Sequence, residues 1–405
     1  MDKRIVLSLF DRTLAEKEPE LGIPELTDGF QFYGGGCAGG MFPVSFFSEV
    51  LDPGTWKIHI AFRALTDVKM LYVFTGRKQL REILTLKKGQ KFEGTYFQNL
   101  APIVPRHFDR IYHAERLFIT ICTQNPEAIE IVECYGAKEQ VPVIWLAGDS
   151  TVTDQPGVIP YDPGAVFSSW GQCLPAFLAD PIALDNQAHS GLTTETFRSE
   201  GHMDLIKQRI HPDDMVLFQF GHNDQKLPHL LADREYPENL RRFIEDVREF
   251  GAQPVLVTPL SRNIWSKEGR YLELLGAHAQ AVRNVGEKEA VFVIDLHEYS
   301  KNLIFREVAG KSCRYFHPGD YTHTCEYGAY RVAGWMAGEL KKLFAQKFRH
   351  MKESVKFEPP EDHWQQFGGH KAVCGGNRQE EQFDYIEKSS TDLVAAIQKA
   401  LAGRE

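Results

Sequence analysis

The sequence predicts a chain of two main parts, in which an all-β sandwich precedes a three-layer α/β domain. Up to residue 138, apolar residues fall in short alternating runs bounded by turn residues, a pattern typical of a β-sandwich. From residue 139 onward, continuous apolar runs alternate with helical stretches, which is typical of a buried parallel sheet covered by helices. We therefore place the sandwich at 1–138, the α/β domain at 139–350 and a C-terminal extension of unknown role at 351–405.

The composition is that of a globular protein with a negative net charge. Of the 405 residues, 43% are hydrophobic and 25% are charged, and 46 basic against 55 acidic side chains give a formal charge of −9. A nucleic-acid binder needs a concentrated basic face, which the scattered basic residues do not provide. The longest apolar runs are strand-sized, far short of the about 20 residues of a membrane-spanning helix. We therefore expect no nucleic-acid partner and no membrane partner.

The first residues and the cysteines indicate a cytoplasmic protein. The apolar run at 5–10 ends at Asp11-Arg12 and is too short for a secretory signal. The seven cysteines are odd in number and contain no Cys-x-x-Cys pair, which argues against a disulfide framework or a zinc site. We expect reduced cysteines, a cytoplasmic location and no bound metal. The sequence leaves the oligomeric state open, a homo-oligomer included.

The individual elements follow from the spacing of the apolar residues. In the N-terminal part, β-rich runs occur at 56–62, 68–74, 116–121 and 128–134. Five apolar runs predict the parallel strands 143–147, 182–184, 215–220, 254–258 and 290–296. Helical patterns occur at 239–250, 271–285, 327–344 and, in the extension, 391–401. In a fold of this class, ligands bind at the carboxyl ends of the parallel strands.

Three motifs fall at such strand ends or just before the last helix. Gly-Asp-Ser-Thr at 148–151 follows the first parallel strand, where a serine can act as a reacting group. Gly-His-Asn-Asp at 221–224 follows the third, and an Asn amide can donate to a developing oxyanion. Asp-Tyr-Thr-His at 320–323 supplies a histidine base together with the carboxylate that fixes its tautomer. Each motif alone also fits a loop or turn, but their combined order points to nucleophilic catalysis.

Together with the segment 186–193, these motifs resemble those of the SGNH (GDSL-type) hydrolase family over about residues 143–343. Gly-Asp-Ser-Thr-Val-Thr-Asp at 148–154 and Gly-His-Asn-Asp-Gln-Lys at 221–226 are similar to the rhamnogalacturonan acetylesterase branch. The resemblance implies a flavodoxin-like α/β/α fold with a central parallel five-stranded sheet. The N-terminal sandwich resembles the galactose-binding-like accessory domains that precede this catalytic domain in related bacterial esterases.

The resemblance also implies a role for each site residue. Ser150 is the nucleophile, His323 is the base that takes its proton, and Asp320 orients His323. The oxyanion hole consists of the backbone N–H groups of Ser150 and Gly191 and the side-chain amide of Asn223. The implied reaction is acyl transfer through an acetyl-enzyme that water then hydrolyses, with no metal or organic cofactor.

From this resemblance we expect a serine carbohydrate esterase that acts on acetylated, rhamnogalacturonan-type oligosaccharides derived from pectin. Two departures from the branch concern the substrate: residues 324–326 read Thr-Cys-Glu where Asn is common, and Thr193 stands where Ser is common. One alternative is an SGNH esterase or lipase that acts on another acyl ester. The other is a catalytically silent carbohydrate-binding protein, against which the complete set of Ser150, Asp320 and His323 argues.

Several further residues have two interpretations. His222 is either a second base or a hydrogen-bonded structural histidine, and Asp149 is either a proton carrier or a buried carboxylate that stabilises its loop. The structural interpretation is favoured for both. Trp170, Trp265 and Tyr271 either stack on sugar rings beside the cleft or belong to the hydrophobic core.

Overall fold

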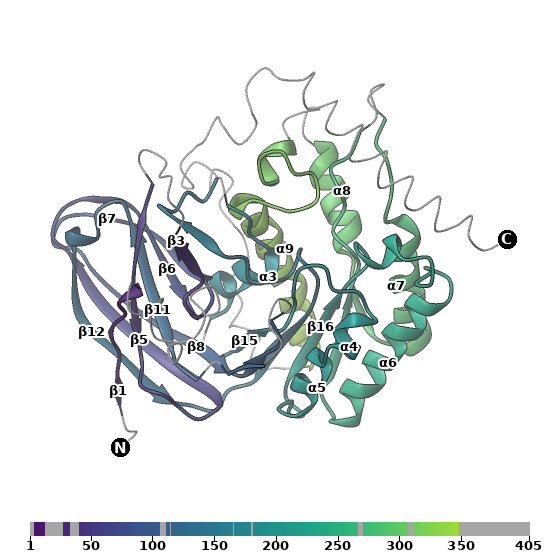
Figure 1. Ribbon diagram of the computed structural model, residues 1–405, viewed down its shortest axis with the longest axis horizontal. Helices are drawn as coiled ribbons and strands as arrows, with labels where there is room; N and C mark the ends of the chain where they lie inside the picture. Colours follow the sequence, from purple (N-terminus) through teal and green to yellow (C-terminus); the bar gives the residue numbers. More distant parts are fainter. Residues whose placement is uncertain are drawn as a thin grey trace.

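The computed structural model describes residues 4–347, except for residues 13–26, 33–39, 106–110, 114, 165, 180, 266–269 and 307–311. The predicted extension at 351–405, with its helix at 391–401, lies outside the described residues. Figure 1 shows the β-rich N-terminal part, in purple and blue, beside the helix-rich α/β part, in teal to yellow-green. The two parts pack against each other along one side.

The five predicted parallel strands are present. They are β13 (Val143–Gly148), β15 (Ala183–Asn186), β16 (Met215–Gln219), β17 (Gln253–Val257) and β18 (Phe292–Ile294). Their order in the sheet is β15-β13-β16-β17-β18, so the chain moves from β13 to one side and then back to the other. This reversal makes the carboxyl end of β13 a topological switch point, where α/β proteins bind their ligands.

Helices cover both faces of these strands. They are α3 (Trp170–Cys173), α4 (Thr196–Ser199), α5 (His202–Lys207), α6 (Glu235–Glu249), α7 (Gly276–Glu289), α8 (Leu296–Arg306) and α9 (Glu326–Lys347). Side chains alternate along β13: Ile144 and Leu146 join one core cluster with α3, α8 and α9, whereas Trp145 and Ala147 join another with α5, α6 and α7. The α/β part therefore has the three predicted layers.

The observed ranges of α6 and α7 can be compared with the helices predicted from the sequence. The amphipathic helix predicted at 239–250 is α6, which buries Leu240, Phe243 and Val247. The helix predicted at 271–285 begins later, at Gly276, because Tyr271 forms an isolated bridge with Trp265 instead. In the part of the chain that the structure describes, no helix is long and apolar enough to cross a membrane.

The N-terminal part consists of two packed groups of strands. One contains β1 (Ile5–Val6), β5 (Gly54–Ala64), β8 (Lys91–Leu100) and β12 (Ile129–Lys138). The other contains β2 (Ser8–Leu9), β4 (Phe42–Phe47), β6 (Val68–Thr75), β7 (Gln79–Leu86) and β11 (Phe118–Thr123). Apolar residues of both groups, such as Ile60 of β5 and Val73 of β6, form one buried cluster between them. Short strands β3 (Phe30–Phe32), β9 (Pro102–Ile103), β10 (Tyr112–His113) and β14 (Gly157–Ile159) complete the described β-structure.

The two parts share a sheet, which differs from the sequence prediction of a sandwich followed by a separate five-stranded sheet. β8 pairs in parallel with β15, where Gln98 lies opposite Leu184. The strands β1, β12, β5 and β8 therefore continue into the parallel strands as one mixed sheet of nine. The physical reason is that β15 would otherwise be an open edge, whose backbone groups a neighbouring strand can satisfy. The likeness to a galactose-binding-like domain and the boundary at 138/139 stay predictions.

Candidate active site

A cleft of about 380 Å³ opens at the carboxyl end of the parallel strands. Its walls come from the loops after β13, β15 and β16 and from the segment before α9. All the predicted site residues line it: Ser150, Gly191, Asn223, Asp320 and His323. The fold thus brings together motifs that are up to 173 residues apart in the sequence.

A chain of short contacts connects the serine, the histidine and the aspartate. Ser150 Oγ lies 2.7 Å from His323 Nε2, and His323 Nδ1 lies 2.7 Å from Asp320 Oδ2. A carboxylate can only accept, so Nδ1 carries the proton of the neutral ring. Nε2 is then unprotonated and can accept the hydroxyl hydrogen of Ser150. The histidine is therefore in the tautomer that can act as a base toward the serine.

Asp320 is held in place by its own loop. Its Oδ1 accepts hydrogen bonds from the backbone N–H groups of Thr322, at 2.7 Å, and His323, at 2.9 Å. Burial alone would raise the pKa of Asp320, but the hydrogen bonds and charge of His323 and the two backbone N–H groups together lower it. The carboxylate is therefore ionised at neutral pH and can stabilise a positively charged His323.

The turn after β13 presents Ser150 to the cleft. Asp149 is fully buried, and its Oδ1 accepts hydrogen bonds from the backbone N–H and the hydroxyl of Thr151, at 2.9 and 2.8 Å. Gly148 is required at the start of the turn, because a Cβ there would lie 2.6 Å from Val152 Cγ2 and 2.8 Å from the carbonyl oxygen of Gln219. These contacts support the interpretation favoured from the sequence, in which Asp149 is a buried carboxylate that stabilises its loop.

The loops after β15 and β16 carry the other polar groups. Gly191 has a φ of 81°, a left-handed conformation that favours glycine. Asn223 Oδ1 accepts a hydrogen bond from Lys226 Nζ at 2.9 Å, and Asn223 Nδ2 donates to the carbonyl oxygen of Leu192 at 3.0 Å. Lys226 thus fixes the orientation of the amide. An amide nitrogen has two hydrogens, so Asn223 keeps one for a ligand in the cleft.

His222 lies behind the site rather than in the chain of contacts. It is 2% exposed, its Nε2 lies 2.8 Å from the carbonyl oxygen of Leu260, and its Nδ1 lies 3.3 Å from Asp149 Oδ2. Since a carbonyl only accepts, Nε2 must donate to Leu260. These contacts support the structural interpretation of His222.

Among the residues of the cleft that were given no role from the sequence are Gln155, Phe167, Lys226 and Arg262. Arg262 is buried and donates to Thr322 Oγ1 and, at 3.2 Å, to the carbonyl oxygen of His222, so that it joins two loops of the site. Burial lowers the pKa of Arg262 to about 10, which leaves it charged at neutral pH. Lys226 and Phe167 line the cleft as well. Lys226 ends the motif at 221–226, and Arg262 ends the segment 258–262, which also resembles the branch, so both were marked by the sequence, whereas no pattern marked Phe167.

The aromatic residues considered from the sequence do not line the cleft. Trp170 is 1% exposed, and its Nε1 donates to Gln219 Oε1 in the core at 2.7 Å. Trp265 and Tyr271 pack edge to face with each other and with Phe305. Instead, the ring of Phe167 stacks on the neighbouring His317 and lies edge-on to His323. In the described ranges, no group of three or more His, Cys, Asp or Glu side chains is arranged to hold a metal ion.

Comparisons with known proteins find relatives for the part that carries the cleft. Residues 146–324 match the GDSL-like Lipase/Acylhydrolase family. The rhamnogalacturonan acetylesterase RhgT of Bacillus subtilis is 33% identical over 213 residues, which cover 49% of this chain and 90% of that protein. The probable rhamnogalacturonan acetylesterase YesY of the same organism is 33% identical over 208 residues, or 49% and 93% of the two chains. The crystal structure of YxiM, also from B. subtilis, superposes with a TM-score of 0.48 at 20% identity, covering 75% of this chain and 82% of that one.

Proposed function

The chain belongs to the GDSL-like (SGNH) hydrolase family, in its rhamnogalacturonan acetylesterase-like branch, and from this premise we propose that it is a serine carbohydrate esterase. The family makes it a carboxylic ester hydrolase. Its proposed substrate is an acetylated, rhamnogalacturonan-type oligosaccharide derived from pectin. The single observation that carries the proposal is the 2.7 Å contact of Ser150 Oγ with His323 Nε2, supported by the 2.7 Å contact of His323 Nδ1 with Asp320.

The first half of the proposed reaction transfers the acetyl group to the protein. Ser150 Oγ attacks the acetyl carbon while His323 Nε2 takes the hydroxyl proton. Asp320, which is ionised, stabilises the imidazolium that forms. A negative charge develops on the carbonyl oxygen. Hydrogen bonds from the backbone N–H groups of Ser150 and Gly191 and from the side-chain amide of Asn223 stabilise this charge. The tetrahedral intermediate then collapses as the bond between the acetyl carbon and the sugar oxygen breaks, and His323 gives the proton to that oxygen, which leaves as a hydroxyl.

The second half regenerates the protein. Water attacks the acetyl-enzyme, and His323 Nε2 accepts a proton from it. A second tetrahedral intermediate forms in the same oxyanion hole and breaks the bond to Ser150 Oγ. Acetic acid leaves and ionises to acetate in solution, and Ser150 recovers its hydroxyl hydrogen from His323. All proton transfers of this cycle pass through one atom, His323 Nε2.

The role proposed for Asn223 leads to a first prediction. Asn223→Ala removes one of three oxyanion donors, and we expect kcat for p-nitrophenyl acetate to fall by about 10²–10³-fold with little change in KM. Steady-state kinetics measures both values. Asn302→Ala, on the exposed side of α8, is the matched control and keeps the wild-type kcat. An Asn223→Ala protein that is folded and has the wild-type kcat would exclude Asn223 from the oxyanion hole.

Features of the cleft support a sugar substrate of the pectic type. Phe167 is 38% exposed at the cleft and offers an apolar surface to a sugar ring. The Lys226 ammonium places a positive charge beside Asn223, which suits an oligosaccharide that contains uronic acid residues.

The free thiols of Cys122, Cys134 and Cys173 agree with the cytoplasmic location that we propose. An oligosaccharide rather than intact polymer is then the substrate.

A comparison of substrates tests this proposal. Acetate release is measured from acetylated rhamnogalacturonan oligosaccharides, acetylated xylan oligosaccharides and p-nitrophenyl acetate, with wild type and Ser150→Ala in parallel. We expect serine-dependent release that is greatest from the pectic substrate. Activity on xylan fragments or on the small ester alone would contradict the proposed sugar while leaving the esterase. Absence of activity on all three would favour the carbohydrate-binding alternative.

A further inference from the structure

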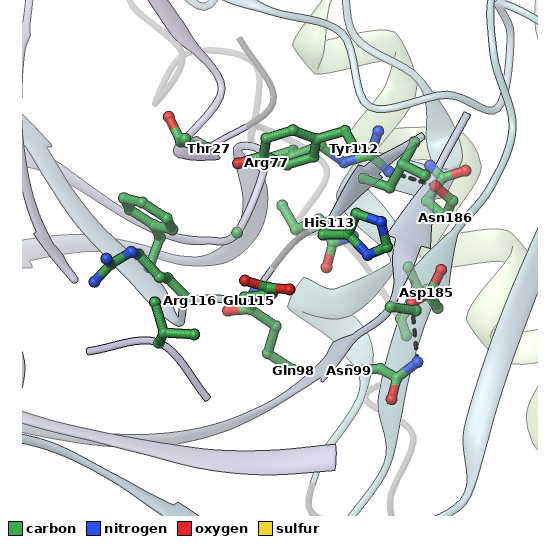
Figure 2. A pocket seen from close by; sticks show the side chains of 17 residues that line it. Thr27, Arg77, Gln98, Asn99, Tyr112, His113, Glu115, Arg116, Asp185 and Asn186 are labelled. Atoms are coloured by element: carbon green, nitrogen blue, oxygen red, sulfur yellow. Dashed lines mark hydrogen bonds between the residues drawn. The ribbon is translucent and has the colours of Figure 1, made fainter. Parts of the chain in front are cut away.

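A turn of the N-terminal part reaches into the α/β part beside the cleft. Residues 76–78 join β6 to β7, and together with Gln79, the first residue of β7, we call them the clamp turn. Three consecutive side chains of the clamp turn contact the other part, and each is largely or fully buried: the side chain of Arg77 is 11% exposed, Lys78 is 0% and Gln79 is 6%. Figure 2 shows Arg77 hydrogen-bonded to Asn186 at the wall of a small polar pocket between the two parts.

The outer two side chains hold the loops that follow β13 and β15. Arg77 Nη2 donates to the carbonyl oxygen of Asn186 and lies 3.3 Å from Asp154 Oδ2, which also accepts from Gln79 Nε2 at 3.1 Å. Asp154 Oδ1 accepts from Asn186 Nδ2 at 2.9 Å. Asp154 lies four residues after Ser150, and Asn186 lies five residues before Gly191. The buried carboxylate of Asp154, in the loop that carries Ser150, thus contacts both the clamp turn and Asn186, at the end of β15.

The middle side chain holds the segment that carries the histidine. Lys78 Nζ lies 3.5 Å from Glu326 Oε2, and both side chains are buried. The ammonium also lies 5.3 Å from the centre of the Tyr161 ring, within reach of a cation–π interaction. Glu326 is the first residue of α9 and follows His323 by three residues. Glu326 is also the last residue of the Thr-Cys-Glu segment, which departs from the pattern of the branch. This unusual residue therefore contacts Lys78 of the N-terminal part.

The backbone of the clamp turn is constrained to deliver these contacts. Gly76 has a φ of 49° and Lys78 a φ of 60°, both in the left-handed region. Non-glycine residues rarely adopt that conformation, and they keep it only when the surroundings hold them there. In addition, Gln172 Nε2 donates to the carbonyl oxygens of Arg77, at 3.2 Å, and Gln155, at 2.8 Å. Through Gln172, the backbone of the clamp turn is therefore also connected to the loop that carries Ser150.

We propose that Arg77, Lys78 and Gln79 are positioning residues of the active site, through which the N-terminal part aligns Ser150, the oxyanion hole and His323 with one another. This inference rests on the proposed function. Ser150, Gly191 and His323 are carried by three separate segments of the chain, and the clamp turn contacts each segment at a point three to five residues from the site residue. Reacting groups must be held within about 0.5 Å of the productive geometry, so a small relative shift of these loops slows the reaction.

The test replaces Arg77, which contacts two of the loops. We expect Arg77→Met to lower kcat for p-nitrophenyl acetate by about 10–100-fold, because a displacement of about 1 Å can cost that much. KM changes little, since the substituted side chain does not touch the ester. Arg63→Met is the matched control. Arg63 lies in β5 of the same N-terminal part and forms an exposed pair with Glu130, so its variant keeps the wild-type kcat.

A second readout separates positioning from mere stabilisation. Diethyl p-nitrophenyl phosphate reacts covalently with an activated serine, and its rate reports the Ser150–His323 geometry in folded molecules. It is measured well below the melting temperature of each variant, which is determined in parallel. We expect the phosphorylation rate of Arg77→Met to fall together with kcat. A variant with a lower melting temperature but the wild-type kcat and phosphorylation rate would overturn the proposal.

A double variant covers the case in which Arg77→Met does not fold. Lys78→Met combined with Glu326→Gln removes the buried pair without leaving an unpaired charge, whereas Lys78→Met alone buries an uncompensated carboxylate. We expect the double variant to be folded, with lowered kcat and phosphorylation rate. Wild-type values for both would contradict the positioning role. If wild type itself shows no Ser150-dependent activity, the proposed function fails, which is distinct from failure of the clamp turn alone.

Discussion

Ser150→Ala is expected to lower kcat for p-nitrophenyl acetate by at least about 10⁴-fold. The substitution removes the hydroxyl that lies 2.7 Å from His323 Nε2 and attacks the ester, so no acetyl-enzyme can form. The remaining rate comes from the oxyanion hole and from substrate binding. Because Ser150 is only half-buried and the substitution removes a single hydroxyl group, we expect the melting temperature of the variant to stay near that of the wild-type protein.

Ser199→Ala is the control for this experiment, because Ser199 is exposed at the end of α4, outside the cleft. It should have the kcat of wild type. Circular dichroism and thermal melting establish that the Ser150→Ala protein is folded. If the folded variant keeps most of the wild-type activity, another group is the nucleophile and the assignment of Ser150 is wrong.

Asp320→Asn is expected to lower kcat by about 10⁴-fold while leaving the fold intact. The reason lies in the two carboxylate oxygens. Oδ1 accepts from the backbone N–H groups of Thr322 and His323, so the amide oxygen of the variant must occupy that position. The amide NH₂ then faces His323 Nδ1 and donates to it. This reverses the tautomer, so that Nε2 carries the hydrogen and cannot accept the proton of Ser150.

Asp213→Asn serves as the matched control, because Asp213 is exposed in the turn before β16. The same steady-state assay, with thermal melting alongside, compares the two variants. Asp320→Asn with a kcat close to that of the control would show that the carboxylate does not set the tautomer of His323. An equal loss in both variants would point to a general effect of removing negative charge.

The parallel strands were predictable from the sequence because strands that are buried on both faces have simple, apolar sequences. β13 and β16 are buried along their whole length, so their sequences are continuous apolar runs. α6 was predictable because one face is buried and the other is exposed. The site residues follow strand ends or precede a helix, and family motifs marked them. Their convergence in one cleft is a property of the fold, which the motifs alone do not contain.

Other features could not be predicted because they depend on contacts between distant segments. β8 joins β15 at a single residue pair, and no alternation of residues encodes which edge a strand extends. A lysine in a turn is ordinarily interpreted as exposed, whereas Lys78 is buried against Glu326, 248 residues away. Trp170 is in the core because its ring fits beside β16, and its sequence position does not distinguish that from a cleft.

In the proposed mechanism Ser150 carries an acetyl group during turnover, and rapid quenching can detect this group. p-Nitrophenyl acetate has a good leaving group, so the acetyl-enzyme should accumulate before it is hydrolysed. Acid quenching in the first turnover, followed by proteolysis and mass spectrometry, locates the label. We predict a burst of p-nitrophenol and one acetyl group on the peptide that contains Ser150. Turnover with no acetylated peptide, or with the acetyl group on another residue, would contradict covalent catalysis by Ser150.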